Sequence, residues 1–135
     1  MSHEIQQREH EGIVILDFKG RITVGPEASA LREKVAAVTA AGSKNIILNP
    51  LHVDYIDSTG LGALVMCATS QRKAGGALKL ENLNRRNIEL LVMTKLATVF
   101  DLFTDEQDAV NSFFPYRAIK QFDILSFVEQ MKKEG

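Results

Sequence analysis

The stretch Tyr55-Ile56-Asp57-Ser58-Thr59-Gly60-Leu61-Gly62 follows an apolar segment that predicts a strand and opens a segment with helical periodicity. Its consecutive Asp, Ser and Thr are residue types that cap helices, where backbone N–H groups lack partners within the helix. Its two glycines fall in the expected first turn, and each costs about 1 kcal/mol of helix propensity. A helix built only for stability would not begin in this way. We therefore expect another backbone to approach this turn closely.

The rest of the chain predicts alternating strands and helices. The expected strands are residues 3–8, 13–18, 46–48, 77–81 and 99–103, on the basis of β-branched or alternating apolar residues. The expected helix starts are Pro26, the quoted stretch, Asn84 and a capping box formed by Thr104 and Gln107. We expect Gly20 and Pro50 to end the second and third strands. The order β-β-α-β-α-β-α-β-α predicts an α/β fold with a mainly parallel sheet.

The C-terminal residues predict one more helix. Pro115 ends the alternating unit, and a possible cap at Asp123 precedes apolar residues at helical spacing, namely Ile124, Phe127, Val128 and Met131. We therefore divide the chain into a domain over residues 1–114 and a C-terminal extension over residues 115–135. The amphipathic helix of the extension is expected to pack on its own domain. The alternative is an arm that binds a partner.

Composition restricts the function and location of the protein. The chain has 135 residues with a net charge of −1, so bulk electrostatics give no reason to expect direct binding of nucleic acid. No apolar run reaches the length of a membrane span, and the N-terminus has no apolar signal region. The single cysteine, Cys67, excludes a disulfide within the chain and a multi-cysteine metal site. We expect a cytoplasmic protein.

The polar residues around the quoted stretch do not form a motif for catalysis or metal binding. Ser58 lacks a Gly-x-Ser-x-Gly elbow, and the histidine nearest to it in sequence is His52. One histidine with Asp54 and Asp57 makes a poor site for a transition metal, and we expect His52 and Asp54 to be exposed loop residues. The glycine-rich turn also lacks the lysine of a phosphate-binding loop. We predict no enzyme activity, no metal and no cofactor.

A phosphate attached covalently to Ser58 is compatible with the same turn. The phosphate would lie at the positive end of the helix dipole, where a dianion is tolerated. The fold should survive, while the local surface gains about −1.5 to −2 charges. A partner surface fitted to the neutral hydroxyl would then lose affinity. Ser58 is the predicted phosphorylation site, and Thr59 is a weaker second acceptor.

These residues resemble the signature of the STAS domain, the sulfate-transporter and anti-sigma-factor-antagonist module. The resemblance rests on Asn49 and on residues 55–64, which contain the Asp-Ser-Thr-Gly-Leu-Gly core. Gly20 before the first helix, Gly75-Gly76 before a strand and residues 96–99 before the last strand agree with it. The resemblance implies a mixed, mainly parallel sheet whose helices pack mainly on one face.

The resemblance, which covers residues 4–114, also implies a function. Most stand-alone bacterial members are anti-sigma factor antagonists, whose unphosphorylated form binds a serine-kinase anti-sigma factor and frees a sigma factor. Phosphorylation of the residue matching Ser58 by that kinase, with ATP, ends binding, and a phosphatase restores it. The implied partner-binding surface consists of Arg21, Thr23, Asp57, Ser58, Thr59, Gly60, Leu61 and Gly62. The family commonly has Glu-Leu-Asp after the glycine at position 20, whereas this chain has Arg21-Ile22-Thr23.

Other functions stay open at this point. A STAS module could hold a larger assembly together, with Ser58 serving only as a helix cap. The same helix N-terminus could instead bind a nucleotide or another anion. Catalysis by Ser58 is the least supported alternative, and the sequence does not set the oligomeric state.

Overall fold

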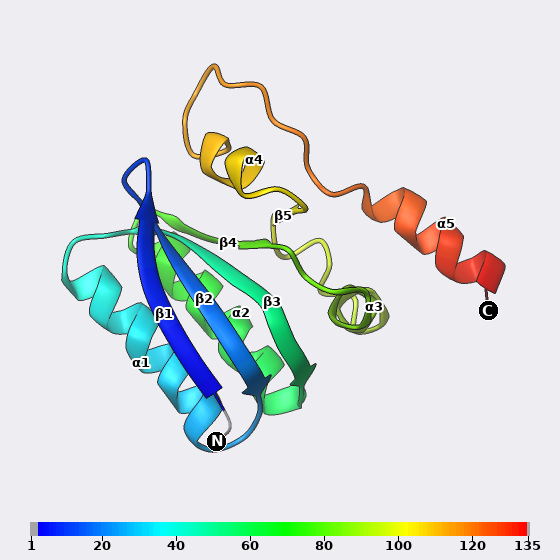
Figure 1. Ribbon diagram of the computed structural model, residues 1–135, viewed down its shortest axis with the longest axis horizontal. Coiled ribbons are helices and arrows are strands. Elements are labelled where there is room, and N and C mark those ends of the chain that lie inside the picture. Colours follow the sequence, from blue (N-terminus) through cyan, green and yellow to red (C-terminus); the bar gives the residue numbers. More distant parts are fainter. Residues whose placement is uncertain (1–2, 135) are drawn as a thin grey trace.

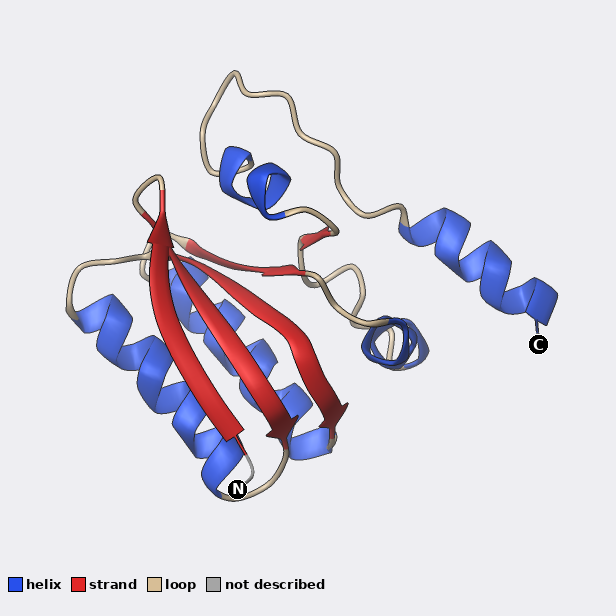
Figure 2. Cartoon of the chain, viewed as in Figure 1, coloured by secondary structure: helices blue, strands red, loops and turns tan. Residues whose placement is uncertain are grey.

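A computed structural model describes residues 3–134, which form a five-stranded mixed sheet with helices on both faces (Figure 1; Figure 2). The elements in chain order are β1 (His3–His10), β2 (Ile13–Ile22), α1 (Pro26–Ala40), β3 (Asn45–Ile56), α2 (Ser58–Lys73), β4 (Ala77–Glu81), α3 (Arg85–Met93), β5 (Leu102–Phe103), α4 (Glu106–Asn111) and α5 (Ile124–Glu134). The strands lie side by side in sequence order, and only β1 is antiparallel to its neighbour. The predicted order of elements and the mainly parallel sheet are confirmed.

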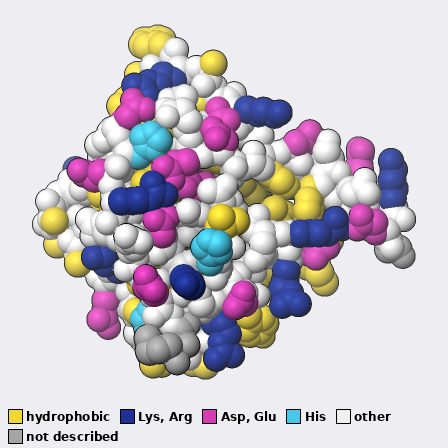
Figure 3. Space-filling view, viewed as in Figure 1, with side chains coloured by type: hydrophobic (Ala, Val, Ile, Leu, Met, Phe, Trp, Pro, Cys, Tyr) yellow, Lys and Arg dark blue, Asp and Glu magenta, His cyan; other side chains and the backbone are white. Residues whose placement is uncertain are grey.

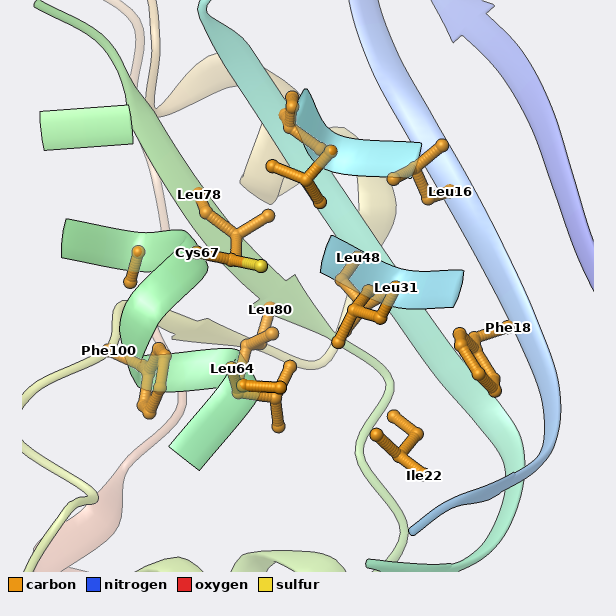
Figure 4. Close-up of a cluster of buried hydrophobic side chains, with 14 of the residues drawn as sticks. Leu16, Phe18, Ile22, Leu31, Leu48, Leu64, Cys67, Leu78, Leu80 and Phe100 are labelled. Atoms are coloured by element: carbon orange, nitrogen blue, oxygen red, sulfur yellow. The ribbon is translucent and has the colours of Figure 1, made fainter. Parts of the chain in front are cut away.

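The larger part of the core lies between the sheet and the pair α1 and α2. Figure 4 shows side chains of β2, β3 and β4, such as Leu16, Leu48 and Leu80, meeting those of the two helices. The buried residues of α1 include the four apolar positions that the helical spacing predicts, namely Ala28, Leu31, Val35 and Val38. Parallel strands connected by helices bury apolar side chains in this way, because each crossover covers a sheet face.

A smaller apolar cluster lies on the opposite face, beneath α4. Ala109 and Val110 of α4 pack there with Ile13, Ile15 and Ile47 of the sheet. The short helix covers only one end of this face, so α1 and α2 remain the main helical layer, as expected (Figure 1). Among residues 3–134, no helix is both long enough and apolar enough to cross a membrane.

Strands β2 and β3 are longer than the sequence predicts. β2 continues through Gly20 to Ile22, and β3 continues through Pro50 to Ile56. The register between the two strands shifts between Asp17 and Lys19 and again after Gly20, so β3 carries bulges. Pro50 lies at the first shift and beyond the last β3 residue that pairs with β4, so its missing N–H interrupts no regular ladder.

Two residues expected in a loop lie in this extended strand. His52 and Asp54 are exposed, as expected, but both belong to β3. The extension matters for function, because it carries β3 to the residue before Asp57. The start of α2 is therefore attached to the sheet and not to a free loop.

The last strand and helix of the domain also differ from the prediction. β5 is only Leu102–Phe103, because the chain forms a turn over residues 97–99 that begins with the hydrogen bond from Val99 N–H to Leu96 O. α4 is capped by Asp105, which accepts the N–H of Asp108 at 3.1 Å, so the predicted capping box at Thr104 is wrong. An aspartate caps as well as a threonine, and the helix begins one residue later.

The C-terminal residues contact the domain through polar groups and through the apolar side chains of Phe122 and Ile124, which pack against the main core. The N–H of Phe122 donates to Leu102 O at 2.9 Å, and the predicted cap Asp123 accepts the N–H of Ser126 at 3.0 Å. Arg85 of α3 forms an ion pair with Glu134 of α5. No α5 residue is fully buried. The extension therefore lies on its own domain, as expected, with little of its surface buried.

Candidate functional site

Asp57 joins the start of α2 to the connection between β2 and α1. Its Oδ1 accepts the N–H of Gly60 at 2.8 Å, and its Oδ2 accepts the N–H of Val24 at 2.9 Å. These hydrogen bonds, the one from Gly60 first, lower the pKa of Asp57 below its ordinary value. The carboxylate is thus ionised and both of its oxygens are engaged. The predicted N-cap role of Asp57 is confirmed.

Ser58 and Thr59 follow the cap, and both are exposed. Within residues 3–134, no hydrogen bond connects the Ser58 hydroxyl to another group. The hydroxyl lies at the N-terminus of a 16-residue helix, where the helix dipole favours negative charge. The structure therefore presents Ser58 to the outside and leaves Asp57 to hold the turn.

The two glycines of this turn have different surroundings. A Cβ on Gly60 would lie 1.8 Å from the backbone oxygen of Ile22, whereas a Cβ on Gly62 would meet nothing within 4 Å. The close approach that the sequence predicts is therefore real at Gly60. The approaching backbone is β2 of the same chain, so Gly60 is buried against Ile22. Its place in the partner-binding surface stays a prediction.

Leu61 also faces the core, with 7% of its surface exposed. It packs in the main apolar cluster with residues such as Ile56 and Leu64. Gly60 and Leu61 thus seat the turn against the sheet. A partner can reach Ser58, Thr59 and Gly62 directly, because these residues are exposed.

Arg21 and Thr23, which stand where the family commonly has acidic residues, occupy different environments. Arg21 is exposed near the end of β2 and pairs with Tyr55 of β3. The Thr23 hydroxyl donates to Oε1 of Glu27 at 2.7 Å, and the Glu27 side chain is buried at the start of α1. Thr23 therefore points inward and fixes the loop, whereas Arg21 is available to a partner.

Sequence reasoning missed an exposed apolar residue beside the site. Val24 is 66% exposed, and its N–H is the group bound by Asp57. Tyr55, two residues before Asp57, is 49% exposed. Large apolar side chains exposed next to a polar turn favour protein contact. The sequence offered one signal for this exposed surface: Val24 lies directly before Gly25-Pro26, in the loop that precedes a helix start.

The geometry at this turn is suited to recognition. Among residues 3–134, no group of three or more His, Cys, Asp or Glu side chains is placed to hold a metal ion. The nearest carboxylate to Ser58 in sequence, Asp57, already accepts backbone hydrogen bonds with both oxygens. A nucleophilic serine needs a base within hydrogen-bond reach. The exposed hydroxyl instead offers a position where a partner enzyme could place a charge.

The fold and the exposed serine after an aspartate cap agree with the family to which the chain belongs. The chain belongs to the STAS domain family, which matches residues 4–109. A curated relative is the anti-sigma-B factor antagonist of Bacillus subtilis (strain 168). It is 33% identical over 110 residues, which are 82% of this chain and 99% of that protein.

Solved structures of anti-sigma factor antagonists have the same fold. One from Mycobacterium paratuberculosis has a TM-score of 0.71 at 20% identity, covering 83% of this chain and 94% of that chain. SpoIIAA from Bacillus, in its phosphorylated form, has a TM-score of 0.62 at 17% identity, covering 81% of this chain and 98% of that chain. These two likenesses support the fold, and the relative at 33% identity supports the family.

Proposed function

We propose that this protein is an anti-sigma factor antagonist that acts by partner switching, with Ser58 as the switch. The observation that carries the proposal is the exposed Ser58 hydroxyl at the N-terminus of α2, next to a carboxylate whose oxygens are both bound by the backbone. The 33% identity to the anti-sigma-B factor antagonist supports the same role. The protein acts by binding and release, and its partner supplies the catalysis.

In the unphosphorylated form, a serine-kinase anti-sigma factor binds the exposed side chains around the first turn of α2. Val24 and Tyr55 provide apolar contact area. The Ser58 hydroxyl, a small neutral group, follows Asp57, whose carboxylate accepts the Val24 N–H. Thr59 and Gly62 extend this surface along the exposed side of the helix. Binding of the kinase to this surface frees the sigma factor that the kinase otherwise holds.

Phosphorylation then ends the complex. The kinase transfers the γ-phosphoryl group of ATP to Ser58 Oγ, which forms an O–P bond, while ADP leaves and the hydroxyl proton is lost. The product carries about −1.5 to −2 charges at a helix N-terminus, so α2 tolerates it. The apolar contacts of Val24 and Tyr55 cannot compensate for a buried dianion in the interface. A phosphatase hydrolyses the phosphoserine and restores the binding form.

The charges beside Ser58 set the choice of partner. The family pattern has acidic residues where this chain has Arg21 and Thr23, and the Thr23 hydroxyl is bound to Glu27. This end of the sheet therefore presents a cation at Arg21. We expect the cognate kinase to present an acidic or neutral group there, since like charges across an interface disfavour binding.

The remaining parts of the proposal concern location and domain limits. The protein works in the cytoplasm, where ATP and the kinase are present. The STAS domain comprises residues 1–114, and residues 115–135 form an extension that contains α5.

The test is the affinity of the serine-kinase anti-sigma factor from the same organism for three forms of the protein. Ser58→Ala should bind like the wild type, and Ser58→Asp should bind about tenfold more weakly or worse, because only Asp adds charge. Unchanged circular dichroism would show that both variants fold. Equal binding by the two variants would remove the charge switch and favour a scaffold role, with Ser58 as part of a helix start.

A further inference from the structure

A groove of about 420 Å³ lies between α1 and α2, apart from the Ser58 turn. Figure 1 shows the two helices side by side beneath the sheet. The groove is lined by Arg32, Val35, Ala36, Thr39, Ala40, Met66, Cys67, Ser70 and Gln71. Met66 is eight residues after Ser58, or about 12 Å along the helix axis. The groove therefore belongs to the later turns of α2.

Most of the groove is apolar, and its inner polar groups are already bound. Val35 and Cys67 are 3% and 4% exposed, and Met66 at the rim is 58% exposed. The buried amide of Gln71 donates to Lys44 O at 2.8 Å and accepts the Thr39 hydroxyl at 2.6 Å. Gln71 therefore has no need of a ligand, and the inner wall offers apolar contact.

Arg32 is the exception among the lining residues. The only hydrogen bond of its guanidinium to residues 3–134 is a long one, 3.4 Å, to Oγ of Ser29, and no carboxylate in that range lies within ion-pair distance. Its charge acts on the Cys67 thiol, although burial is the larger effect and raises the pKa of Cys67 to about 11. The thiol is therefore neutral, and the groove combines an apolar wall with a cation that lacks a counter-ion.

We propose that this groove binds a small amphipathic carboxylate. Its apolar tail would lie along Val35, Met66 and Cys67, and its carboxylate would pair with Arg32. The volume of about 420 Å³ falls in the range of small-molecule sites, which are mostly apolar with a few polar groups that fix orientation. Arginine is well suited to the ligand head because its planar N–H groups match a carboxylate.

Ligand binding at this groove would be a second way, besides phosphorylation, to affect the helix that carries Ser58. α2 carries Ser58 at its N-terminus and forms one wall of the groove at its later turns. A ligand held between α1 and α2 would therefore contact the helix that presents the switch. The proposal does not require that Ser58 is phosphorylated, so either proposal can fail without the other.

The test is an amide NMR titration of the full chain with octanoate below its micelle-forming concentration. Octanol and octylammonium serve as probes with the same tail and a different head. Octanoate should give saturable shifts at Val35, Ala36, Met66 and Cys67, and should bind about tenfold more tightly than octanol. Octylammonium should bind most weakly, because it brings a second cation to Arg32.

Two variants and one control complete the experiment. Arg32→Gln should abolish the preference for octanoate over octanol, and Ala36→Phe, at an exposed lining position, should block all three probes. Lys34→Gln removes another α1 cation that does not line the groove and should change nothing. Equal binding of octanoate and octanol, shifts confined to other residues, or no saturation would overturn the proposal. Shifts of the same residues on concentrating the protein alone would assign the groove to a second copy and would also overturn it.

Discussion

Two carboxylates at helix N-termini, Asp57 before α2 and Glu106 in α4, are used in different ways. Asp57 accepts hydrogen bonds from the N–H groups of Gly60 and Val24, and the next two side chains, Ser58 and Thr59, are exposed. Glu106 instead binds Arg8 at 2.8 Å and His10 at 2.7 Å, both on the edge strand β1. One turn is held by the backbone and faces outward, and the other attaches its helix to the sheet through side chains.

The cluster around Glu106 contains many charged groups, yet these partly exposed groups pair with one another. Arg8 also donates to Asp17 at 2.6 Å, and the side-chain amide of Asn49 donates to the same carboxylate at 2.8 Å. The pKa of Glu106 is lowered, chiefly by the hydrogen bonds from Arg8, and the pKa of buried Glu81 beside it is raised, chiefly by desolvation. Figure 3 shows acidic and basic side chains intermixed over the visible face. The number of charges alone therefore does not identify the functional site.

The largest loss of stability is expected from a substitution at Gly60, where the first turn of α2 meets β2. Gly60→Ala would place a methyl group 1.8 Å from Ile22 O, and because that oxygen is backbone it cannot move aside cheaply. The free energy of unfolding should fall by about 3 kcal/mol. Gly62→Ala is the matched control in the same helix turn. It meets nothing within 4 Å and should raise stability by about 0.5–1 kcal/mol. Urea denaturation compares the two, and equal losses would contradict the packing of Gly60.

The second prediction concerns the pH dependence of stability that buried Glu81, beside Glu106, should cause. The pKa of Glu81 is raised from its ordinary value of 4.5 to about 9, first by burial and then by Glu106, so the folded state keeps a proton that the unfolded chain releases. This contribution to stability is complete below about pH 4.5 and is lost as the pH rises toward about 9. Glu81→Gln carries no such proton. Its stability relative to the wild type should grow by up to about 1.4 kcal/mol per pH unit in that window.

Urea denaturation at intervals across this pH range measures the slope for each protein. Glu4→Gln, at an exposed position of β1, controls for the loss of one carboxylate. Parallel stability curves for wild type and Glu81→Gln would mean that Glu81 does not hold a proton in the folded state.

The third prediction concerns the contribution of the Asp57 cap to stability. Asp57→Ala leaves the N–H groups of Gly60 and Val24 without their acceptor and should lower the melting temperature, whereas Asp57→Asn keeps a capping oxygen and should lower it less. The lowered pKa of Asp57 means that its ionised form is stabilised, so the wild-type advantage should disappear as pH falls through that pKa. Thermal melts of the three proteins at acidic and neutral pH check both points. Identical melting temperatures at neutral pH would contradict the cap.

The smallest change in stability is expected at Val24, an exposed residue beside the Ser58 turn. Val24→Ser removes an apolar contact without burying or exposing a core residue, so stability should stay within about 0.5 kcal/mol of the wild type. Affinity for the kinase should fall by about 1 kcal/mol, or about fivefold. Met93→Ser, at a 75% exposed position of α3, is the matched control. Equal affinities of the two variants, measured by calorimetry, would remove Val24 from the interface.

Much of the fold was predictable because short-range signals agree with it. The capping residues Asp57, Asn84 and Asp123 act as predicted, and the apolar stripe of α1 is buried. The lengths of β2 and β3 were not predictable, since Gly20 and Pro50 ordinarily end strands. Here the bulges between the two strands accommodate them, and bulges depend on pairing with a distant segment.

The site was predictable only in part for the same reason. Sequence alone places Ser58 after a cap and suggests a close backbone approach in the next turn. It does not reveal that β2 is the approaching strand, because Ile22 is far away in the sequence. The exposure of Val24 depends equally on the loop that Asp57 holds. Contacts between distant segments therefore decide which residues of the motif remain available to a partner.

The most direct test of the central claim is phosphopeptide mapping after incubation with ATP and the serine-kinase anti-sigma factor of the same organism. Wild type and Ser58→Ala would be treated in parallel. The account predicts a single phosphate on Ser58 in the wild type and no phosphate on Ser58→Ala. A phosphate on another residue in both proteins, or no phosphate although both proteins bind the kinase, would contradict the assignment of Ser58 as the switch.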